Sequence, residues 1–74
     1  MNTAILLVDS VTYAVKARRL LGRMGIIATI KKVNAEDGRG CRYGIIIERR
    51  YLFDTMAALS AEKISFTQLR GGNE

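Results

Sequence analysis

The only cysteine of the chain, Cys41, stands in a segment rich in glycine and arginine and is the residue best suited to covalent chemistry. Arg39 and Arg42 flank it, and neighbouring cations favour the nucleophilic thiolate over the neutral thiol. Gly40 carries no side chain, so a sulfur atom or an anionic group of a partner can approach the backbone closely. The sequence therefore predicts a reactive thiol at Cys41.

Missing residue types exclude most other chemistry. The chain has no histidine, so it has no imidazole base and no Cys/His pair for nucleophilic catalysis. A single cysteine without histidine gives neither an internal disulfide nor a zinc site. We therefore expect no metal and no cofactor, and a carrier or binding protein rather than a self-contained enzyme.

Length, composition and charge predict one small globular domain. The 74 residues are 49% hydrophobic, which fits a packed unit, and a core of this size is often supported by dimerisation, so a homodimer is a reasonable expectation. No apolar run is long enough to cross a bilayer and residues 1–9 lack the features of a signal peptide, so we expect a cytoplasmic protein. The net charge of +5 favours acidic partners.

The first half of the chain shows a strand followed by a helix. Residues 4–8 form an apolar run that predicts a buried strand, and Ser10 is a favoured helix N-cap. Residues 11–24 have a helical pattern, and Gly25 suits a left-handed C-cap. Cations line one face of this helix at Lys16, Arg19 and Arg23, whereas the apolar positions are Ala14, Ala17, Leu21 and Met24.

The second half predicts a hairpin and another helix. Residues 26–33 are rich in β-branched side chains and indicate a half-exposed strand, and the polar residues 34–40 are typical of a hairpin connection. Residues 43–48 then indicate a buried strand. Apolar residues at helical spacing predict a helix over residues 50–61, with Met56 in the core.

The order of these elements predicts a fold. With a last strand over residues 64–69, the chain reads βαββαβ, which favours an α+β, ferredoxin-like domain with an antiparallel sheet in the order 4-1-3-2 and two helices on one face. The domain spans residues 1–70, and residues 71–74 are expected to be a flexible tail. In this topology Cys41 opens the third strand near Ser10.

Several of these residues also match a known family. The chain resembles small bacterial proteins described as selenium/sulfur carrier-like domains. The matching features are the apolar strand ending in Asp9 and Ser10, the helix with Ala14 and Ala17, the pair Gly25 and Ile26, and Cys41 followed by Gly44. The resemblance implies a ferredoxin-like fold whose Cys41 carries a persulfide or selenium adduct. This chain departs from the family in having no proline before the cysteine and no glycine directly after it.

The first functional hypothesis is a thiol-based sulfur or selenium carrier. Cys41 is the acceptor, and its partners are sulfur or selenium donor and acceptor proteins, which supply the attacking and resolving groups. Asp9 would disfavour the thiolate if its carboxylate came close. The residues expected to bind the adduct or the partner are Arg39, Gly40, Arg42, Gly44 and Ser10.

The second hypothesis is a non-catalytic interaction or regulatory module. It would bind a partner protein, a small ligand or RNA through a basic edge formed by Arg23, Arg49, Arg50 and Arg70. RNA-recognition sheets stack bases on aromatic residues of adjacent central strands, and here Tyr43 is the single aromatic in such a place. Nucleic acid is therefore not an expected partner in this mode.

Overall fold

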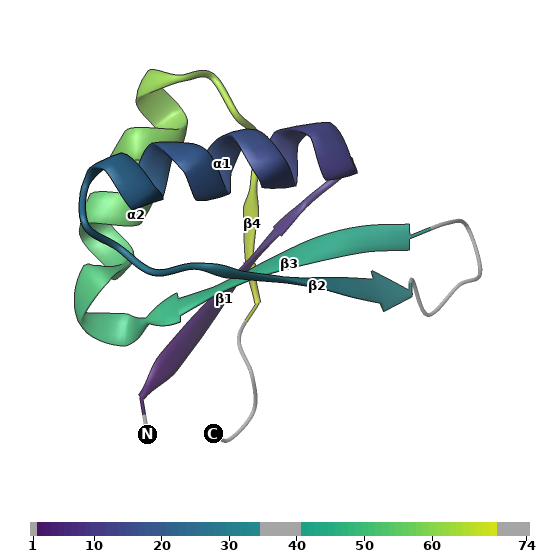
Figure 1. Ribbon diagram of the computed structural model, residues 1–74. Coiled ribbons are helices and arrows are strands. Elements are labelled where there is room, and N and C mark those ends of the chain that lie inside the picture. Colours follow the sequence, from purple (N-terminus) through teal and green to yellow (C-terminus); the bar gives the residue numbers. More distant parts are fainter. Residues whose placement is uncertain (1, 35–40, 70–74) are drawn as a thin grey trace.

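The computed structural model describes residues 2–34 and 41–69. The elements follow one another as β1 (Thr3–Val8), α1 (Val11–Arg23), β2 (Thr29–Asn34), β3 (Cys41–Glu48), the 3-10 turn η1 (Arg49–Tyr51), α2 (Leu52–Ala61) and β4 (Thr67–Leu69) (Figure 1). The prediction of a small α+β domain with two helices is confirmed. Of the predicted turn over residues 34–40, Asn34 is the last residue of β2, whereas residues 35–40 and the predicted tail lie outside the described residues.

The four strands form one antiparallel sheet in the order β2-β3-β1-β4, which read from the β4 edge is 4-1-3-2. Leu6 of β1 is the partner of Ile45 in β3, and Ile45 is in turn the partner of Ile30 in β2. Side chains of a strand alternate between faces, and burial alternates in the same way along β1. Both helices lie over the buried face of the sheet (Figure 1).

Local signals at both ends of α1 explain where this helix starts and stops. Ser10 has extended backbone angles, and its Oγ accepts a hydrogen bond of 3.2 Å from the Tyr13 N–H, as the N-cap prediction requires. At the other end Gly25 has a φ of +82°, and the Ile26 N–H donates to the Leu21 carbonyl. This is a Schellman ending, which confirms the predicted left-handed cap.

The end of α2 repeats this arrangement without a glycine. Lys63 has a φ of +59°, and the Ile64 N–H donates to the Leu59 carbonyl at 2.9 Å. Ile64 is buried after the turn, just as Ile26 is after α1. Ile64 therefore belongs to the C-terminal cap of α2. The strand β4 begins at Thr67 rather than at the predicted residue 64.

Replacing Lys63 with glycine is expected to raise the free energy of unfolding by about 0.5–1 kcal/mol. A side chain in the left-handed region costs roughly 1 kcal/mol because its Cβ crowds the following carbonyl, and glycine removes that cost. Urea denaturation of the wild type and of Lys63→Gly measures the change. Lys63→Ala keeps the Cβ and serves as the control, so an equal gain in both variants would contradict this explanation.

The predicted core is correct at most positions and wrong at Met24. Leu21 is fully buried, and Met56 packs against the core as predicted. Met24 is 46% exposed because it is the C-cap of α1, where the chain reverses, and Ile26 occupies the core instead. Ile27 is 88% exposed, and β2 begins only at Thr29.

Candidate functional surface

The start of β3 lies at the end of the sheet where α1 begins. Tyr43 is the partner of Val8, the last residue of β1, and Arg42 Nε is 3.9 Å from Asp9 Oδ1. Cys41 is the first residue of β3 and the backbone partner of Asn34. The side chain of Cys41 lies outside the described residues, as do Arg39 and Gly40 altogether, so the reactive thiol stays a prediction.

Of the other residues predicted around the thiol, Ser10 and Gly44 have roles in the fold, whereas Arg42 lies in an exposed ion pair. Ser10 caps α1 with its hydroxyl. Arg42 lies beside Asp9, with both side chains exposed, and such a surface pair contributes little to stability. Gly44 is buried in β3, where an added Cβ would lie 3.2 Å from Ile5 Cγ2. The glycine is thus explained by close packing on the sheet.

The arginines that follow β3 contact their own chain. An Arg49 guanidinium nitrogen donates to the Thr3 carbonyl at 3.3 Å. Arg50 Nε lies 2.7 Å from Glu48 Oε1, and its guanidinium stacks 4.8 Å from the centre of the Tyr51 ring. These contacts occupy both guanidinium groups, so this edge is only partly available to an anionic partner.

The described members of the predicted basic edge line two different hollows. Arg49 and Arg50 line a hollow with Glu48 and the start of β1, whereas Arg23 lines a different hollow along α1. Arg70, the fourth member, lies outside the described residues. The cations of α1 therefore form a surface of their own.

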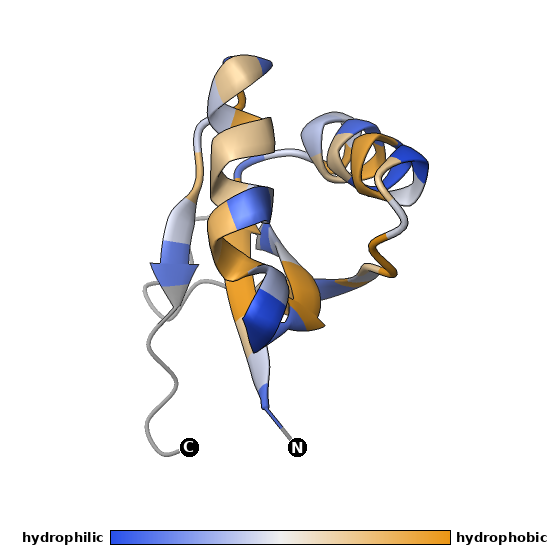
Figure 2. Ribbon diagram, turned by 90° about the vertical axis from the view of Figure 1, so that its left-hand side faces the viewer, coloured by the Kyte–Doolittle hydropathy of each residue, from blue (hydrophilic) through white to orange (hydrophobic). Residues whose placement is uncertain are grey.

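The outer side of α1 carries an uninterrupted row of cations. Lys16, Arg19 and Arg23 are all exposed and line a shallow hollow together with Val11, Thr12 and Val15. We call these three cations the basic row. Figure 2 looks nearly along α1 and shows hydrophilic and hydrophobic sides around the helix.

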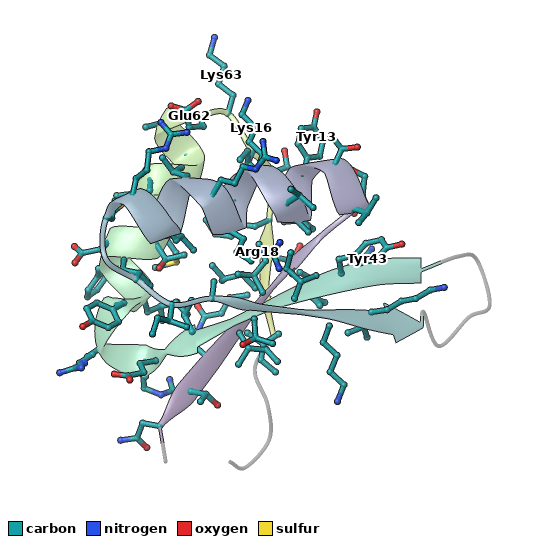
Figure 3. The ribbon with its side chains drawn as sticks, in the orientation of Figure 1. Tyr13, Lys16, Arg18, Tyr43, Glu62 and Lys63 are labelled. Atoms are coloured by element: carbon teal, nitrogen blue, oxygen red, sulfur yellow. The ribbon has the colours of Figure 1, made fainter. Side chains whose placement is uncertain are left out.

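Among the described residues, no ion pair joins the basic row to a carboxylate. The sequence of α1 contains no aspartate or glutamate. Among residues 2–34 and 41–69, the ion pairs are Arg42 with Asp9 and Arg50 with Glu48, and neither involves α1. Lys16 projects away from the sheet, whereas Arg18 lies on the opposite side of the helix (Figure 3). The basic row is thus a concentrated positive surface.

The sequence pattern places these cations on one helix face, and the second hypothesis uses only Arg23 of the three, as part of a basic edge. Charged residues on one face of a helix usually contact only solvent. The signal that could have singled them out is the absence of any acidic residue over Val11–Arg23, because exposed helices usually mix both signs.

No group of three or more His, Cys, Asp or Glu residues in the described ranges could hold a metal ion. The described helices include none with the length and apolar character to span a membrane. The chain matches no protein-family profile, no curated protein and no solved structure.

Proposed function

We propose that this domain is a non-catalytic binding module that holds an anionic macromolecule against the outer side of α1. The observation that carries the proposal is the basic row, which has no acidic residue on its helix and no ion pair within the described residues. The scaffold that we propose is ferredoxin-like, and the strand order together with two helices on one face supports it.

Charge placement favours α1 over the other basic positions. Arg50 is already paired with Glu48 and Arg42 lies beside Asp9, so each would have to give up a partner to bind an anion. Arg19 and Arg23 are in no ion pair with another described residue. A guanidinium can donate two parallel hydrogen bonds to one phosphate, sulfate or carboxylate. The net charge of +5 also attracts polyanions over a longer range.

Heparin chromatography tests this proposal. The wild type is expected to bind heparin and to elute only as salt is raised, because salt screens the contacts with the basic row. The Arg19→Gln, Arg23→Gln double variant should elute at clearly lower salt. Glutamine is a good helix former, so the fold is kept.

A matched control separates the site from overall charge. Lys31→Gln with Lys32→Gln removes the same charge from exposed positions on β2. This control is expected to elute close to the wild type. Equal losses in both double variants, or no retention of the wild type, would contradict binding at α1.

A second candidate function is that of a sulfur or selenium carrier acting through Cys41. Its support is the family resemblance together with the position of Cys41 at the start of β3, at the same end of the sheet as the start of α1. The thiolate would attack the outer sulfur of a donor protein's persulfide, forming a new S–S bond at Cys41 and releasing the donor's thiolate. An acceptor protein would later remove that sulfur.

Intact mass spectrometry tests the carrier. Wild-type protein incubated with a cysteine desulfurase and free cysteine is expected to gain the mass of one sulfur atom, and this gain should disappear on treatment with a reductant. Cys41→Ser should gain nothing, yet it should still bind heparin like the wild type. A wild-type mass that does not change would rule out persulfide transfer.

A further inference from the structure

We infer that the polyanion is a single-stranded nucleic acid, whose phosphates contact the basic row while a base stacks on Tyr13. This inference rests on the proposed function, since it names the partner of the same surface. It also revises the expectation that nucleic acid is not a partner, because that expectation considered only stacking on the sheet.

The spacing along α1 places an aromatic ring next to the first cation of the basic row. Tyr13 precedes Lys16 by three residues, so the two side chains are neighbours on the helix surface, and Arg19 and Arg23 follow Lys16 at i+3 and i+7. At 1.5 Å per residue, the distance along the axis from Lys16 to Arg23 is about 10 Å. A strand lying along the helix would meet these cations in succession.

Tyr13 is available for stacking. The residue is 44% exposed, and its side chain projects from α1 on the same side as Lys16, away from the sheet (Figure 3). Its backbone is fixed by the hydrogen bond to Ser10 Oγ, so the ring is carried on a stable helix start. Surfaces that bind single strands combine such an exposed aromatic with a basic track, because every base has a face that can stack.

The sheet does not offer the same chemistry. Tyr43 is half-buried and packs against the core on the helix side. On the opposite face of the sheet, the neighbouring positions of β1 and β3 hold aliphatic residues, namely Ile5, Leu7 and Ile46. Tyr51 lies beside Arg49 and Arg50, but the Arg50 guanidinium already covers its ring. Tyr13 is the exposed aromatic that shares a helix with the basic row.

Other polyanions fit this surface less well. An anionic membrane is bound most strongly by a helix that inserts an apolar side, and the apolar side of α1 is buried against the sheet through Ala14, Ala17 and Leu21. A protein partner would need a larger apolar centre, whereas the hollow along α1 offers only Val11 and Val15. Phosphates spaced along an unpaired strand need only cations and an aromatic ring.

Binding in this mode has a measurable signature. Three phosphate contacts to a single strand give a slope of about −2 for log K against log salt, and the contacts carry no sequence preference. Loss of one stacked base weakens binding by about 5- to 100-fold. Salt dependence and stacking can therefore be measured as separate effects.

Fluorescence anisotropy with a labelled oligothymidylate and the full chain tests the inference. Tyr13→Leu should weaken binding by about 5- to 100-fold at constant salt. Phe53→Leu is the matched control, since Phe53 is 82% exposed on α2, and it should bind like the wild type. The Arg19→Gln, Arg23→Gln variant should reduce the salt slope to about −1.

The remaining outcomes decide between this inference and the proposed function. Retention on heparin without binding to oligothymidylate would overturn the inference and leave the proposed function standing. Tighter binding to a duplex of equal length, to polyglutamate or to phosphatidylserine vesicles would overturn it as well. Equal effects of Tyr13→Leu and Phe53→Leu would remove the stacking contact and with it the preference for single strands. Absence of binding to every polyanion, heparin included, would overturn both.

Discussion

Replacing Leu21 with alanine is expected to lower the free energy of unfolding by about 3 kcal/mol. Leu21 is completely buried between α1 and the sheet, so the truncation removes apolar contacts and leaves a cavity. Its carbonyl also accepts the N–H groups of Met24 and Ile26 at the helix end. Domains of this length are stabilised by roughly 4–11 kcal/mol, so the loss is a large share of the total.

Thermal and urea denaturation of Leu21→Ala measure this loss. Leu20→Ala is the matched control, because Leu20 is its neighbour on the same helix and is only partly buried. The control should lose clearly less stability. Similar small losses in both variants would show that α1 does not pack on the sheet through Leu21.

Replacing Thr55 with valine is expected to raise the free energy of unfolding by about 1–2 kcal/mol. Thr55 is completely buried in α2, and its Oγ1 has no hydrogen-bond partner among the described residues. An unpaired buried hydroxyl costs about 1–3 kcal/mol, and valine replaces it with a methyl group of similar size. Both residues are β-branched, so helix propensity hardly changes.

The control for this gain is Thr55→Ala. Alanine removes the hydroxyl but also the buried methyl group, and the cavity is expected to offset the gain or exceed it. Urea denaturation of both variants isolates the hydroxyl from the packing. A loss of stability in Thr55→Val would mean that Oγ1 has a partner in solution, such as an enclosed water molecule.

The two stability predictions concern buried residues, Leu21 and Thr55, whereas the proposed binding surface is the outer side of α1. Leu21 packs against the sheet, whereas Arg19 and Arg23 are exposed. Glutamine at the two arginines should therefore change binding with little change in unfolding. Stability and binding can be varied separately in the same helix.

Sequence predicted α1 well because its signals are local. The serine cap, the apolar spacing and the glycine at position 25 all act within a few residues, and the structure uses each of them. Local signals were ambiguous after α2. Residues 64–69 alternate like a strand, yet Ile64 ends the helix through a lysine in the left-handed region, where glycine would normally give the signal.

The candidate site was harder to predict because it depends on contacts between residues that are far apart in the sequence. Cys41 is predicted as a site because it is the only cysteine of the sequence, and Arg49 and Arg50 because they are adjacent cations. No local pattern shows that Arg49 reaches Thr3, 46 positions away in the chain. No local pattern shows either that the cations of the basic row make no ion pair with another described residue, which is what distinguishes them from Arg42 and Arg50.

The central claim is that the outer side of α1 binds polyanions, and a heparin fragment titrated into the ¹⁵N-labelled full chain tests it most directly. Amide chemical-shift changes should concentrate on residues 12–23 and be absent from the Arg19→Gln, Arg23→Gln variant at the same concentrations. Changes centred on Arg42 or on η1, with α1 unaffected, would contradict the account.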